Sequence, residues 1–111
     1  MEARFLRCEP ADFGIPVIAL HELYFGAFKG PFTQANLARI AALEFEVVGF
    51  GADEAREAGR IRAHLASAGT QIGAFDNLIA AQALARELIL ITHDTREFVR
   101  VPGLKIEDWE A

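Results

Sequence analysis

Three acidic residues stand where they could do chemistry together. Asp76 is the only charged residue in the stretch IGAFDNLIAAQALA, at the head of an almost entirely apolar segment. Glu22 follows the apolar segment 15–20 by two residues, and Asp94 follows the apolar segment 88–92 by two residues. Carboxylate oxygens are preferred ligands of Mg²⁺ and Mn²⁺, and an ion held in this way makes water acidic enough to attack a phosphodiester. The spacing therefore predicts metal-dependent hydrolysis if the three acids meet.

The elements that would position these acids alternate between strands and helices. Strands that are apolar on both faces indicate a parallel sheet with helices on both faces, an α/β fold. Ligands of such sheets bind beyond the carboxyl ends of the strands, where we expect Glu22, Asp76 and Asp94 to converge. The pattern predicts the end of a helix within 1–8, strands at 15–20, 46–50, 88–92 and 104–107, and helices at 21–28, 34–44, 52–68 and 75–86.

Each acid taken alone also has a purely structural interpretation. Asp76 would be favoured in the first turn of a helix by capping and by the helix dipole. Glu22 could be a solvated acid at a helix start, and Asp94 a turn residue. Only their joint placement favours the metal site.

Composition limits the class of protein. The 111 residues are 52% hydrophobic, which predicts one domain spanning 1–111, and the net charge of -5 argues against a broad phosphate-binding surface. No apolar run reaches the about 18 residues that cross a bilayer, and no signal peptide is visible. The single cysteine, Cys8, fits a reducing compartment. We expect a cytoplasmic protein without a membrane partner, with Trp109 as a core or dimer anchor.

Three long segments carry a family resemblance. IPVIALHELYFGAFKG, GRIRAHLASAGTQIGAFDNLIAAQALA and LILITHDTREFVRVPGLKIEDW together resemble the PIN-domain ribonuclease toxins of the VapC type. The helix pattern I-G-x-x-D-x-L-I-A-A and the turn pattern T-x-D-x-x-x-F, followed by V-P-G-L, are the specific parts. The resemblance covers nearly the whole chain.

The resemblance implies a fold, an activity and partners. A PIN-like domain of this kind is a toxin of a type II toxin–antitoxin pair, an endoribonuclease whose acidic cluster binds Mg²⁺ or Mn²⁺ and whose product carries a 5′-phosphate and a 3′-hydroxyl. The family's acids fall on Glu22, Asp76 and Asp94, and Thr92 matches a hydroxyl position beside them. The implied partners are the RNA substrate, a cognate antitoxin and a second copy of the chain. Candidate contacts to RNA are Thr92, His93, Arg96, Lys29 and Arg100.

One family motif is absent. Such toxins begin with a strand that ends in D-T-N, and this sequence contains no such motif. We therefore expect a PIN-like sheet whose first strand is missing, with two buried strand edges lacking partners. Two functions stay open: an active ribonuclease, or a catalytically impaired module that binds an antitoxin or dimerises. A receiver-like domain with an acidic Mg²⁺ pocket is a weaker third alternative, because the lysine expected after a late strand is not evident.

Overall fold

The computed structural model describes residues 4–7 and 13–108, so Cys8 and Trp109 lie outside the described residues. The α/β class expected from the sequence is confirmed. The elements are β1 (Arg4–Arg7), β2 (Phe13–Pro16), α1 (Val17–Lys29), α2 (Thr33–Ala41), β3 (Glu46–Val48), α3 (Ala52–Ala68), α4 (Ala74–Ala85), β4 (Ile89–Thr92), α5 (Thr95–Phe98) and β5 (Ile106–Glu107).

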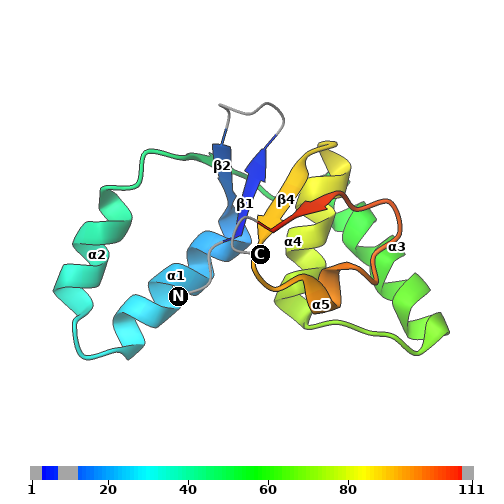
Figure 1. The fold of residues 1–111 in the computed structure, drawn as a ribbon, viewed down its shortest axis with the longest axis horizontal. Helices are drawn as coiled ribbons and strands as arrows, with labels where there is room; N and C mark the ends of the chain where they lie inside the picture. Colours follow the sequence, from blue (N-terminus) through cyan, green and yellow to red (C-terminus); the bar gives the residue numbers. More distant parts are fainter. Residues whose placement is uncertain (1–3, 8–12, 109–111) are drawn as a thin grey trace.

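The five strands form one sheet in the order β3-β2-β1-β4-β5. The outer pairs, β2 with β3 and β4 with β5, are parallel, as expected. The central strand β1 is antiparallel to both of its neighbours. In Figure 1 the short β1 arrow lies between β2 and β4, while α1 and α2 extend to the left of the sheet and α3 lies to its right. The expectation of an all-parallel sheet is therefore corrected to a mixed sheet.

The second correction concerns the first described residues. Arg4–Arg7 was expected within a helix end, but it is a strand whose residues pair with Ile89–Thr92. Leu6 is fully buried at the centre of this strand. The physical reason is that the edges of β2 and β4 carry backbone donors and acceptors that need partners away from water. The segment supplies them, so the edges expected to be unpaired are joined.

The third correction concerns the segment 15–20. The expected strand ends at Pro16, and α1 begins directly at Val17. Proline has a fixed φ that suits a helix start, and no N–H is needed there. An apolar run of this length does not distinguish a strand from a buried helix turn. Glu22 lies within α1, as the helix predicted at 21–28 required, but this helix begins four residues earlier than expected.

Packing between α3 and α4 forms the core that supports the site. The expected boundaries 52–68 coincide with α3, and Ala58, Ile61 and Leu65 on its apolar stripe are buried. Gly69 ends the helix with a φ of 70°, a conformation that favours glycine. The facing helix α4 buries Ile79 and three of its alanines. Within the described residues, no helix is long and apolar enough to cross a membrane.

Gln82 joins α4 to the segment after β3. Its side chain is fully buried, and Nε2 donates to the backbone oxygens of Val48 at 2.7 Å and Gly49 at 3.0 Å. Gln82→Met keeps the shape but removes both donors, so we expect the free energy of unfolding to fall by about 1–3 kcal/mol. Urea unfolding monitored by circular dichroism measures this. The control is Gln34→Met at an exposed position of α2, and an equal loss in both variants would contradict the role of Gln82.

Candidate active site

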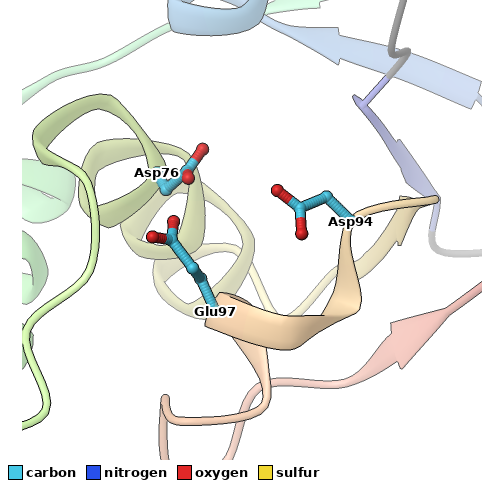
Figure 2. Close-up of side chains that lie close together, drawn as sticks. All are labelled: Asp76, Asp94 and Glu97. Carbon is cyan, nitrogen blue, oxygen red and sulfur yellow. The ribbon is translucent and has the colours of Figure 1, made fainter.

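Three carboxylates gather at one edge of the sheet. Asp76 lies in the first turn of α4, Asp94 directly precedes α5, and Glu97 lies within α5. One ligand oxygen from each lies within 4.8 Å of the others. Figure 2 shows the carboxylates of Asp76 and Glu97 facing each other, with the Asp94 side chain directed toward them. The structure therefore brings together two of the three acids selected from the sequence, with a third acid that was not selected.

Glu22 lies beside this group but is not one of the three clustered acids. Its side chain on α1 is 34% exposed, and Oε1 is 3.5 Å from Nη1 of Arg4. Because Arg4 also contacts Asp76 and Asp94, Glu22 is linked to the cluster through a shared guanidinium. The earlier start of α1 does not remove Glu22 from the site.

Glu97 is the site residue that sequence reasoning missed. It lies three residues after Asp94, and one turn of helix brings positions three apart onto the same side. Its carboxylate also accepts the backbone N–H of Gly73 at 3.4 Å. The sequence T-R-E-F contains this glutamate, but its position beside Asp94 can be inferred only if residues 95–98 are assigned to a helix and not to a turn.

Arg4 is the principal positive charge among these acids. Its Nη2 lies 3.3 Å from Asp76 and 3.8 Å from Asp94, and its side chain is only 11% exposed. The guanidinium carbon lies 5.6 Å from the centroid of the Phe98 ring. A guanidinium held over an aromatic face and between carboxylates is well placed to offset their mutual repulsion.

Burial and the neighbouring acids perturb the ionisation of the cluster. Burial, followed by a hydrogen bond to Glu97, raises the pKa of Asp76 to about 7, although the charge of Arg4 acts in the opposite direction. The same hydrogen bond, donated by the Asp76 carboxyl, lowers the pKa of Glu97. The pair therefore shares a proton near neutral pH, as expected for two carboxylates so close together.

The expected RNA contacts occupy different environments. Thr92 is buried, and its hydroxyl accepts the backbone N–H of Asp94 at 3.1 Å, so it shapes the turn that carries that acid. His93 is exposed, with Nδ1 3.6 Å from Asp108, and Arg96 is exposed on α5. Arg100 donates to the backbone oxygen of Gln71 at 3.0 Å. Thr92 is thus enclosed, whereas His93 and Arg96 are accessible to a large ligand.

The donor set fits a divalent cation. Asp76, Asp94 and Glu97 offer only carboxylate oxygens, which are the ligands that Mg²⁺ and Mn²⁺ prefer. The raised pKa of Asp76 shows that the cluster resists carrying its full negative charge, and a divalent cation would remove that cost. These three residues, with Glu22 alongside, could therefore hold the ion expected from the sequence.

Comparison with known proteins decides the family. Residues 2–104 match the family described as PIN domain. The chain belongs to the PIN-domain family. Within it, the chain is of the VapC ribonuclease toxin type, because it is 43% identical over 97 residues to the tRNA(fMet)-specific endonuclease VapC of Shigella flexneri. That alignment spans 86% of this chain and 74% of the relative. The family resemblance expected from the sequence is confirmed.

Solved PIN-domain toxins share the fold. The crystal structure of DNA-bound VapBC from Salmonella typhimurium matches with a TM-score of 0.83 at 41% identity, over 86% of this chain and 74% of that chain. VapBC-1 from nontypeable Haemophilus influenzae matches with a TM-score of 0.86 at 28% identity, over 94% of this chain and 80% of that chain. The mixed sheet described above is thus compatible with the PIN fold.

Proposed function

We propose that the chain hydrolyses phosphodiester bonds of RNA with a Mg²⁺ or Mn²⁺ ion held by Asp76, Asp94 and Glu97. The observation that carries this proposal is the convergence of the three carboxylates within 4.8 Å, in a chain of the VapC type. A bound divalent cation would supply acidified water and stabilise negative charge on the scissile phosphate.

The chain's own residues have separable roles in this proposal. Asp76, Asp94 and Glu97 would hold the ion through their carboxylate oxygens. Glu22, which is 34% exposed on α1, faces the same space and is suited to accept a proton from the attacking water. Thr92 holds the Asp94 turn through its hydroxyl. Arg96 and His93 on the accessible rim orient the RNA backbone by charge and hydrogen bonding.

RNA cleavage by the purified chain tests this function. The Shigella flexneri relative is named for cleavage of tRNA(fMet), so initiator tRNA is the first substrate to use, with an elongator tRNA for comparison. Cleavage should require Mg²⁺ or Mn²⁺, stop with a chelator, and leave a 5′-phosphate that a ligation assay detects. Cleavage that persists in the chelator would contradict the metal-dependent mechanism.

Metal affinity should depend on pH, since the ion must displace the proton shared within the cluster. The pKa of Asp76 is raised from 3.8 to about 7, so Mn²⁺ should bind up to about tenfold more tightly per pH unit below 7 and level off above it. The groups facing Asp76 are Glu97, Glu22, Asp94 and Arg4. Calorimetry at pH 6, 7 and 8 measures the affinity, and a flat profile would contradict the prediction.

The stability of the metal-free protein should follow the opposite trend. A carboxyl whose pKa is raised by folding contributes stability that is complete below its unfolded value and is lost as the pH rises through the folded value. For Asp76 this window runs from about 4 up to about 7. The lowered pKa of Glu97 acts in the other direction, because its contribution is lost as the pH falls below its ordinary range.

A binding module is the second candidate function. The ion pairs of Arg4 with Asp76, Asp94 and Glu22 support it, because a cluster that accepts one guanidinium can accept another from a partner protein without turnover. Relatives with solved structures are VapBC complexes, so we propose a cognate antitoxin as that partner. Co-purification with the antitoxin in the absence of any RNA cleavage would favour this function over catalysis.

Exposed aromatic residues support a protein partner. Phe25 and Phe28 on α1 and Phe32 before α2 are 61%, 65% and 69% exposed. In Figure 1 the helices α1 and α2 project away from the sheet. Apolar side chains gathered in this way usually mark an interaction surface. We assign this surface to the antitoxin or to a second copy of the chain, and measurement of molar mass by light scattering, with and without the antitoxin, distinguishes them.

A further inference from the structure

The reversed direction of β1 places a basic residue where the acids gather. Thr92 is the last residue of β4, and Asp94 follows it at the carboxyl end of the strand. Because β1 is antiparallel to β4, its first residue, Arg4, pairs with Thr92. A strand running the other way would bring its last residue to this position. The strand direction therefore determines which side chain of the central strand enters the site.

The guanidinium of Arg4 contacts two of the three clustered carboxylates, Asp76 and Asp94. Its guanidinium lies within 3.3–3.8 Å of oxygens of Asp76, Asp94 and Glu22. Phe98 supports the group from one side, with the guanidinium carbon 5.6 Å from the ring centroid. The Arg4 side chain is 11% exposed and paired with several carboxylates, so its charge is costly to leave unpaired. We therefore expect the guanidinium to stay in place unless another cation replaces it as the partner of these carboxylates.

We propose that Arg4 is an internal cation that closes the site, and that a divalent ion binds the carboxylates only after the Arg4 side chain has withdrawn. This inference rests on the proposed metal-dependent function. It adds an inactive state in which Arg4, a residue of the chain itself, occupies the metal-binding carboxylates. Asp76 and Asp94 are shared by both cations, and their oxygens cannot serve a guanidinium and a small metal ion at the same distances. Withdrawal of Arg4 is then the step that converts the inactive form into the metal-binding form.

Arg4→Met tests the competition directly, because methionine keeps an unbranched apolar side chain but has no charge. Mn²⁺ binding is measured by calorimetry for wild type and variant at one pH and ionic strength. Removal of a charged hydrogen-bonding competitor should tighten Mn²⁺ binding by about tenfold. Melting curves recorded without metal establish that each variant is folded.

Arg7→Met is the matched control. Arg7 lies on the same strand but pairs with Glu107, outside the carboxylate cluster. Its removal changes the net charge equally and should leave the Mn²⁺ affinity unchanged. Equal affinities for folded Arg4→Met and wild type, or an equal gain in Arg7→Met, would overturn the inference. No Mn²⁺ binding by any folded form would overturn the proposed metal site and this inference with it.

A second measurement uses the unmodified protein, in case Arg4→Met does not fold. Phenylglyoxal reacts with accessible guanidinium groups, and tandem mass spectrometry reports the extent of labelling at each arginine. Saturating Mn²⁺ should increase labelling of Arg4 severalfold and leave Arg7 unchanged. Labelling of Arg4 that stays constant while Mn²⁺ binds would show that both cations occupy the site together, which would overturn the inference.

Discussion

Asp76→Asn is expected to abolish Mn²⁺ binding and to reduce RNA cleavage by at least roughly a hundredfold. The substitution preserves the shape of the side chain but removes the charge that Arg4 contacts and that the proposed metal ion would require. Asp76 is central because its oxygens face Glu97 on one side and Arg4 on the other. Calorimetry and the tRNA cleavage assay measure the two losses independently.

The same variant should stay folded, which separates this result from simple unfolding. Asp76 is partly buried, with a pKa raised to about 7, so a neutral amide at this position relieves part of the cost of its charge. The control is Asp53→Asn, an exposed first-turn acid on α3, which should retain metal binding and cleavage. Full cleavage by folded Asp76→Asn would remove this carboxylate from the mechanism.

Phe98→Ala is expected to lower the free energy of unfolding by about 3–5 kcal/mol. Phe98 is fully buried in the core directly after Glu97 in the chain, and its ring lies under the Arg4 guanidinium. The loss combines the apolar surface withdrawn from the core with the cavity that remains. Urea unfolding measures it, and Mn²⁺ binding should weaken in parallel because α5 carries Glu97.

Phe25→Ala is the control for this prediction. Phe25 is 61% exposed, so its truncation should change stability by no more than about 0.5 kcal/mol. If Phe98→Ala is too unstable to purify, Phe98→Leu should lose about 1–2 kcal/mol and permit the comparison. Similar losses at positions 98 and 25 would mean that α5 is not anchored through its aromatic residue.

The elements that local pattern could predict are those with a strong period and a clear stop. Helix α3 matches its expected range because Ala58, Ile61 and Leu65 recur on one face and Gly69 follows. Strand β4 was recognisable from the buried run before Asp94. In both cases the information lies within a few turns or residues of the element itself.

The features that could not be predicted from the sequence are mainly those formed by contacts between residues far apart in the chain. Nothing local in Arg4–Arg7 indicates a strand, because its pairing with β4 is formed with residues near the other end of the chain. The ion pairs of Arg4 were hidden for the same reason. Glu97 was missed because a four-residue helix leaves almost no periodic signal. Asp76 and Asp94 could be predicted as site residues, because the order of strands and helices along the chain is enough to place both at one edge of the sheet.

The reversed central strand also determines how the molecule holds together. Among the described residues, β1 is the hydrogen-bonded link between the pair β3-β2 and the pair β4-β5. It pairs through four residues with β4 but through two with β2, so local opening should begin on the β2 side. Detachment of this one strand would divide the sheet and withdraw Arg4 from the acids in the same motion. Cooperativity of the fold and access to the carboxylates therefore depend on a single short segment.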